Sequence, residues 1–152
     1  MPTKSTPKKT RRRNRIAVQA AVAGAPSAAL LRRFARAGLS TSAHADITLR
    51  VVGRAEGRKL NKLFRKKEYP TNVLSFPYGK GNGDIVLCHP VIAKEARAQG
   101  KTLRTHYAHL VVHGVLHLRG HDHLRKSEAA RMERMEIRIL RRLGFDDPYA
   151  LK

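Results

Sequence analysis

Residues 102–123 combine a long apolar helical pattern with most of the histidines of the chain, and this segment constrains the fold more than any other. Six of the eight histidines lie between His106 and His123. Gly120 is a suitable helix stop, because glycine readily adopts the left-handed conformation that turns the chain back. The apolar residues recur with helical spacing and predict a core-facing band, made of Leu103, Tyr107, Leu110, Val111, Val115 and Leu118.

The histidines of this helix are spaced to bind one metal ion. His113 and His117 lie one turn apart on the same face, with about 5–6 Å between their Cβ atoms, so that two imidazoles can reach one ion. The turn at Gly120 allows His123 to approach the same point from another direction. Three neutral nitrogen ligands leave a fourth position open. This arrangement is typical of a catalytic zinc site, whereas a structural site is usually closed by cysteines.

The spacing alone does not select the ligand set. His109 and His113 are also four residues apart, as are His117 and His121. His106 lies near the same face of the helix. Several pairs of imidazoles therefore remain open on geometric grounds.

The pattern HxxxHxxxxxH also occurs in elongated zinc-protease motifs, which carry a glutamate directly after the first histidine. Here that position is Gly114. Since the glutamate is the usual general base of peptide hydrolysis, its absence makes a zincin-like metalloprotease the weaker interpretation.

The segment His113-Gly-Val-Leu-His-Leu-Arg-Gly-His-Asp-His closely resembles the motif of the YbeY family, bacterial metal-dependent endoribonucleases of ribosomal RNA maturation. The resemblance covers about residues 46 to 144. Further motifs follow in family order: Leu60-Asn61 with Arg65, Thr71-Asn72-Val73-Leu74-Ser75-Phe76-Pro77, Gly83-Asp84-Ile85, and a closing helix with Met132 and Glu136.

The resemblance implies one Zn²⁺ per chain, held by the family's three zinc positions, which are His113, His117 and His123. It implies that Arg65 helps to hold or stabilise the scissile phosphate. The family usually has a tyrosine before this arginine, and here the residue is Phe64. Bound zinc would lower the pKa of a water molecule and polarise a phosphoryl oxygen.

Several other residues are candidates for a role beside the metal or the substrate. The resemblance implies that His109 supports a metal ligand from behind or contacts the substrate, that His106 lies at the surface, and that His121 is the histidine least required. The remaining candidates are Asp84, which either caps a turn or orients a ligand, Asp122, which would fix a ligand ring, and the polar residues Asn72 and Ser75 of an expected strand. No carboxylate is obvious as the general base.

The function implied by the resemblance is a single-strand-preferring endoribonuclease that acts in maturation of small-subunit ribosomal RNA and in ribosome quality control. Its partners would be ribosomal RNA and the small ribosomal subunit, with no nucleotide cofactor. The alternative from another class is a ribosome-associated RNA-binding module whose metal is structural.

The charge of the chain also favours a polyanionic partner. Thirty-two Lys and Arg residues against eleven Asp and Glu residues give a net charge of +21. Such a charge favours nucleic acid in general, without indicating RNA, and a merely solubilising surface has the same composition.

Composition favours a single cytoplasmic domain, and the resemblance implies that the cytoplasm is bacterial. Cys88 is the only cysteine, so an intramolecular disulfide is excluded, and no apolar run has the length of a membrane span. Residues 1–14 are expected to form a disordered basic arm, 15–145 the domain and 146–152 a short tail. The acid-free N-terminal region also meets the crude description of an organelle transit peptide, which we consider the weaker interpretation.

The hydrophobic periodicity predicts an α+β fold with a small mixed sheet flanked by helices. The histidine motif and the resemblance add a zincin-like metal site at the end of the long helix. Buried side chains are expected from Leu60, Leu63 and Phe64 in one helix and from Ala130, Met135, Ile139, Leu140 and Leu143 in the last. The expected strands are 15–22, 46–52, 73–76 and 84–88, and the expected helices are 27–37, 56–64, 90–99, 102–118 and 127–143.

Overall fold

The computed structural model describes residues 14–20, 22–39, 44–65, 71–79, 81–121 and 125–150, with the backbone alone described for residues 64 and 65. The predicted mixed sheet flanked by helices is confirmed. The elements in chain order are β1 (Arg15–Ala20), α1 (Ala28–Gly38), β2 (Asp46–Val52), α2 (Arg54–Arg65), β3 (Val73–Gly79), β4 (Asn82–Cys88), α3 (His89–Ala98), α4 (Leu103–Leu118) and α5 (Lys126–Arg142).

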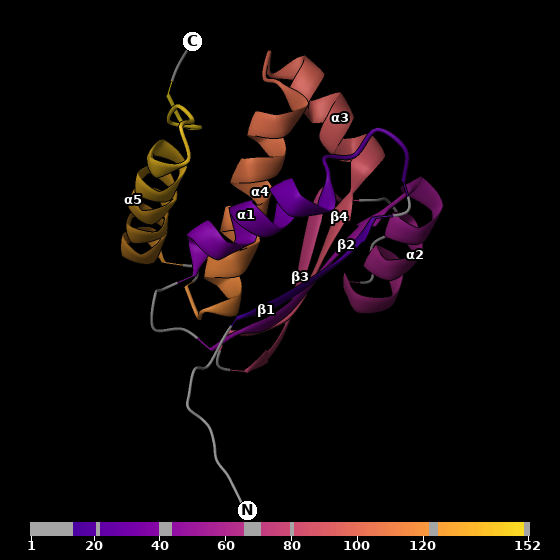
Figure 1. Cartoon of the computed structure of the whole chain (residues 1–152), viewed down its shortest axis with the longest axis horizontal. Coiled ribbons are helices and arrows are strands. Elements are labelled where there is room, and N and C mark those ends of the chain that lie inside the picture. The colour runs from indigo at the N-terminus through magenta and orange to yellow at the C-terminus, as the bar shows by residue number, and fades with distance from the viewer. Residues whose placement is uncertain are drawn as a thin grey trace, which may run out of the picture.

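The four strands form one sheet in the order β1-β2-β4-β3, in which β1, β2 and β4 are parallel and β3 is antiparallel to β4. Side chains alternate between the two faces of the sheet. One face supplies Ile47, Leu49 and Ile85 to the main core, which α1, α4 and α5 complete. The other face carries a smaller cluster covered by α2, so that the sheet has a helix layer on each side (Figure 1), with cluster residues Val52, Leu74, Val86 and Cys88.

Helix α4 lies at the centre of the larger core and is buried on most of its sides. Gly114 allows it to approach the sheet closely, because a Cβ atom there would lie 3.1 Å from two side-chain carbons of Ile85 and 3.3 Å from Ser75 Oγ. The predicted band is buried except for Leu103, which is partly buried. The helix begins after Thr102, whose hydroxyl accepts a hydrogen bond from the Thr105 N–H. It is therefore held rigidly while presenting a few polar side chains.

Two predictions were wrong: one about where the third strand ends, and one about which apolar residues are buried. Strand β3 continues beyond Phe76 and includes Pro77, which pairs with Gly83. A register shift between Pro77 and Gly79 accommodates the proline, as is usual on an edge strand. Residues 78, 79, 82 and 83, which fall between the expected strands 73–76 and 84–88, therefore belong to β3 and β4.

The two misplaced apolar residues are Leu63, which is 63% exposed, and Ala130, which is also exposed. In α5 the buried stripe instead begins at Met132. Among the described residues, no helix combines the length and apolar character needed to cross a membrane.

Candidate functional site

Glu136 of α5 is the polar centre of the candidate site. It is fully buried and accepts three hydrogen bonds: its Oε1 from His109 Nε2 at 2.9 Å and from the Tyr149 hydroxyl, and its Oε2 from His113 Nδ1 at 2.6 Å. Burial by itself raises the pKa of Glu136, but the hydrogen bonds from His109, His113 and Tyr149 outweigh it and lower the pKa to about 2. The group is therefore a carboxylate that only accepts hydrogen bonds.

This carboxylate determines the tautomers of the two histidines that face it. His113 donates from Nδ1, so that in the neutral ring the lone pair lies on Nε2, the form suited to a metal ligand. His109 donates from Nε2, and its Nδ1 is buried without a hydrogen-bond partner in the described part of the chain. Glu136 engages the Nε2 atom of His109, whereas it leaves the Nε2 atom of His113 as the lone-pair nitrogen. His113 and His117 are therefore favoured over His109 and His113 among the pairs that spacing left open.

His113 and His117 lie side by side near the end of α4. Their ring centroids are 4.9 Å apart with an interplanar angle of 75°. The His113 side chain is 26% exposed, in contrast to the Glu136 side chain, which is 1% exposed. Two imidazoles on one helical face therefore lie beside solvent while the carboxylate behind one of them is sealed.

The chain reverses directly after these histidines. Gly120 has a positive φ of 96°, and the His121 N–H donates to the Leu116 carbonyl at 3.0 Å, as predicted for a left-handed helix end. His123 and Asp122 lie outside the described residues. Within the described ranges, no group of three or more His, Cys, Asp or Glu side chains is gathered closely enough to hold a metal ion.

The other predicted site residues lie at different places. Arg65 is the last residue of α2, and its side chain is outside the described part of the structure. Ser75 of β3 lies against the backbone of Gly114, the residue that follows His113. Asp84 of β4 accepts a hydrogen bond from the exposed Tyr78 hydroxyl at 2.5 Å, which ties β3 to β4.

Asn72 belongs to a second cluster, near the start of α4. Its side-chain amide donates to Glu95 Oε1 at 3.0 Å, and His106 Nε2 donates to the same oxygen at 2.8 Å. The expectation that His106 lies at the surface was wrong, because this residue is only 3% exposed. With a helical rise of about 1.5 Å per residue, His106 and His117 are separated by about 16 Å along α4.

Gly114 excludes a side chain of the kind that zinc proteases carry at this position. A Cβ atom already meets Ile85 and Ser75 at 3.1–3.3 Å. A glutamate side chain would therefore have to displace the sheet rather than reach the metal. The protease interpretation loses its general base for a structural reason as well as a chemical one.

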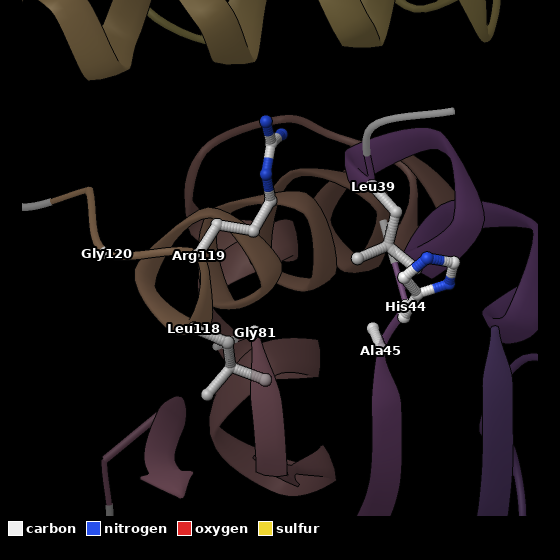
Figure 2. A pocket seen from close by; sticks show the side chains of 7 residues that line it. All are labelled: Leu39, His44, Ala45, Gly81, Leu118, Arg119 and Gly120. Atoms are coloured by element: carbon white, nitrogen blue, oxygen red, sulfur yellow. The ribbon is translucent and has the colours of Figure 1, made fainter. Parts of the chain in front are cut away.

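Two neighbouring hollows lie beyond the end of α4 and share Leu39 and Arg119. Figure 2 shows the first hollow, in which Leu118 and Arg119 extend in different directions from the end of the helix. The second lies between α1 and α5 and is lined by three arginines, Arg119, Arg138 and Arg142, over an apolar floor. Among the described residues that line the two hollows, none is acidic. Together they form a basic surface beyond the end of α4, separate from the hollow that His113 lines with Glu133, Glu136 and Tyr149.

Comparison with known proteins identifies the chain. The family model described as "Endoribonuclease YbeY" matches residues 13–144. The chain belongs to the YbeY endoribonuclease family. The resemblance based on the histidine motif is thereby confirmed.

Relatives in the YbeY family share about half of their residues with this chain. Endoribonuclease YbeY of Aromatoleum aromaticum is 52% identical over 131 residues, which cover 84% of each protein. That of Polynucleobacter asymbioticus is 47% identical over 137 residues, covering 88% of this chain and 87% of the relative. The solution structure of TM1509 from Thermotoga maritima has the same fold, with a TM-score of 0.55 and 22% identity over 90% of this chain and 99% of that one.

In the sequence, Glu136 is recognisable only as part of a YbeY motif, and its contacts with His109, His113 and Tyr149 were not predicted. A signal for them exists in the sequence. Glu136 lies four residues after Met132 and four before Leu140, on the apolar stripe of α5. A carboxylate on a buried stripe requires hydrogen-bond donors, and the nearby histidine-rich helix is the obvious source.

Proposed function

We propose that this chain is a zinc-dependent endoribonuclease that prefers single-stranded RNA and acts in maturation of small-subunit ribosomal RNA and in ribosome quality control. Family membership supports the endoribonuclease activity. The observation that carries the metal dependence is the His113 imidazole, whose Nδ1 is bound to the buried Glu136 while its ring lies 4.9 Å from that of His117.

The residues present fit a zinc ion. The ligands would be His113, His117 and His123, and Glu136 would act as the outer carboxylate that fixes the His113 tautomer and ring orientation. The donor set is all nitrogen, which suits zinc. When bound, zinc supplies a Lewis acid and lowers the pKa of a coordinated water molecule.

The protein's own groups would bind and orient the RNA. Arg65 would neutralise charge on the scissile phosphate, since a guanidinium binds a phosphate through two hydrogen bonds. Ser75 is a candidate substrate contact because it lies beside Gly114 on the side of the sheet that faces α4. His109 acts through Glu136, because its Nε2 donates to that carboxylate.

The basic surface beyond α4 would bind the RNA backbone. Arg119 donates to the Gly38 carbonyl at 2.8 Å, which fixes its side chain at the junction of the two hollows. Arg138 and Arg142 are exposed on α5 and continue the surface. Because each phosphate contact releases counterions, we propose that this surface contributes to a steep loss of RNA affinity with added salt.

The central experiment replaces one proposed ligand and keeps a matched histidine. His117→Ala should lose bound zinc and cleavage of single-stranded RNA while retaining most of its RNA affinity. His121→Gln, in the same segment, should keep both zinc and cleavage. Zinc content by elemental analysis and cleavage of labelled RNA in nuclease-free preparations provide the measurements. If His117→Ala cuts RNA as fast as the parent protein, the chain is an RNA-binding module whose metal, if any, is structural.

The wider setting requires separate tests. Residues 15–145 are proposed as the catalytic domain, residues 1–14 as a basic arm for RNA and the bacterial cytoplasm as the compartment. Deletion of residues 1–14 should reduce the salt dependence of RNA binding, and an unchanged slope would remove the arm from the binding surface. Co-sedimentation with small ribosomal subunits tests the ribosomal partner.

A further inference from the structure

The segment that follows α5 carries a tyrosine that reaches the candidate metal site, although the family model ends at residue 144. Tyr149 donates a hydrogen bond from its hydroxyl to Glu136 Oε1. Its ring packs edge-on against that of His109, with the centroids 5.3 Å apart and an interplanar angle of 85°. A residue beyond the family match therefore contacts two members of the Glu136 cluster.

The path of the chain from α5 to this tyrosine is fixed by local contacts. Gly144 has a positive φ of 93° and reverses the chain, and the Phe145 N–H donates to the Leu140 carbonyl at 2.9 Å. The Phe145 ring then packs against Phe34 of α1, with the centroids 5.8 Å apart. Residue 145 is thereby anchored to the main core, and the segment after it starts from a defined point.

A turn stabilised by an aspartate then presents the tyrosine. The Tyr149 N–H donates to Asp147 Oδ1 at 2.8 Å, a hydrogen bond typical of a turn built on aspartate. The Lys101 ammonium donates to the Pro148 carbonyl at 3.5 Å. These contacts hold residues 147–149 against the start of α4, with the tyrosine directed at Glu136.

The hydroxyl completes the set of donors around a charge that is excluded from water. Glu136 is 0% exposed, and among the described residues Oε1 has two donors, His109 and Tyr149, whereas Oε2 has only His113. A buried carboxylate requires several donors to remain charged. With Oε1 held by His109 and Tyr149, Oε2 stays aligned on His113 Nδ1, which leaves Nε2 of that ring as the lone-pair nitrogen.

We propose that Tyr149 is a positioning residue of the site: by donating to Glu136 it keeps that carboxylate in place behind His113 and so pre-orients His113 to bind zinc. This proposal rests on the proposed zinc site. It assigns to residues 145–150 a role in the site rather than that of a polar tail. Because the hydroxyl acts through Glu136, its removal should weaken metal binding more than it weakens folding.

The test compares Tyr149→Phe with Tyr78→Phe in the full-length chain. Both variants remove a hydroxyl that donates to a carboxylate, but the Tyr78 hydroxyl is bound to Asp84 at the edge of the sheet. Zinc affinity is measured by competition with a chelating indicator, and folding by urea unfolding of the zinc-free protein. We expect zinc affinity to fall about tenfold in Tyr149→Phe, within the range of about 10- to 100-fold seen for such outer partners, and to stay within twofold in Tyr78→Phe.

A second measurement separates this proposal from the zinc site itself. In zinc-free protein, exchange of the His113 Nδ1 proton with solvent, followed by nitrogen-15 NMR, should accelerate in Tyr149→Phe and remain unchanged in Tyr78→Phe. Failure of the wild-type chain to bind zinc would defeat the proposed function, while the proton exchange would still test the link from Tyr149 to His113. Unchanged exchange together with zinc affinity within twofold of wild type would overturn the role of Tyr149.

Discussion

Helix α4 supplies the histidine of two histidine–carboxylate pairs, one nearer each of its ends. The two pairs differ in which partner is buried. Near the start, the His106 side chain is 4% exposed and that of Glu95 is 33% exposed. Further along, the Glu136 side chain is 1% exposed and that of His113 is 26% exposed. The same two residue types therefore form a sealed imidazole in one place and a sealed carboxylate in the other.

This difference indicates what each pair can do. At the start of α4 the imidazole is enclosed, and Glu95 connects it to Asn72, so that the pair fastens α3, α4 and the start of β3 together. At Glu136 the carboxylate is enclosed and the His113 ring lies beside solvent and beside His117. Only the second arrangement leaves an oriented imidazole within reach of an ion or substrate.

The largest expected effect is the removal of the sealed carboxylate. Glu136→Ala should destabilise the protein by about 3–5 kcal/mol, since it removes three hydrogen bonds to a buried carboxylate, each of about 1.5–3 kcal/mol at most because the donors are partly exposed. Glu95→Ala should destabilise the protein by about 1–2 kcal/mol, because the Glu95 carboxylate, which is the hydrogen-bond acceptor of this pair, is partly solvated. Urea unfolding of zinc-free protein measures both. Zinc affinity should fall about 10- to 100-fold in Glu136→Gln and remain unchanged in Glu95→Gln. Equal losses of affinity would erase the distinction between the two pairs.

The pH dependence of stability should also separate the two pairs. Burial is the main cause that lowers the pKa of His106 below 6.5, so the unfolded chain takes up a proton before the folded chain does. Stability attributable to His106 is therefore lost as pH falls below about 6.5, with a slope of at most about 1.4 kcal/mol per pH unit. For Glu136, with a pKa lowered from 4.5 to about 2, the stabilisation is present above pH 4.5 and is lost as the pH falls towards 2.

The measurement is urea unfolding at pH 7, 6 and 5 in wild type and in His106→Gln. The variant should lose stability less steeply between pH 6.5 and 5 than the wild type does. His89 and His121, whose pKa values burial also lowers, provide a background slope that both proteins share. Parallel curves would show that the pKa of His106 is the same in the folded and the unfolded chain, and would contradict its lowering by burial.

The sequence predicted most of the fold because periodicity records which face of an element is buried. Every expected helix and strand is present, and β2 has the expected bounds, Asp46–Val52. The errors lie where tertiary contacts override local pattern. Pro77 is tolerated in β3 because it lies on an edge strand with a register shift. Leu63 matches the helical spacing of the apolar stripe of α2, yet its side chain is exposed.

The candidate site was predictable only in part. Spacing brought His113 and His117 together, because four residues along a helix always place side chains on one face. Spacing could not show that Glu136 binds His109 and His113. These contacts join residues of two different helices that are 27 and 23 positions apart in sequence. It also could not distinguish His106 from the other histidines, because only its contact with Glu95 reveals its structural role.

Asn72 and Ser75 are three residues apart on the same chain segment, yet Asn72 binds Glu95 whereas Ser75 lies against Gly114. Asn72→Ala should cost about 1 kcal/mol, because it removes the hydrogen bond to Glu95 and the one that its Oδ1 accepts from the Val73 N–H. RNA cleavage at a temperature where the variant is folded should be unchanged. A cleavage defect without a loss of stability would restore Asn72 as a residue of the active site.

Ser75 should show the converse, with the smallest effect on stability and a measurable effect on activity. Its hydroxyl lies against Gly114 rather than in the Glu95 cluster, so Ser75→Ala should change the free energy of unfolding by less than about 0.5 kcal/mol. If the hydroxyl contacts RNA, losing one hydrogen bond of about 0.5–1.5 kcal/mol should lower kcat/KM about 2- to 10-fold. A rise in KM at constant kcat would indicate ground-state binding by β3, whereas unchanged kinetics would reduce Ser75 to a packing residue and confine the chemistry to α4, its terminal turn and Arg65.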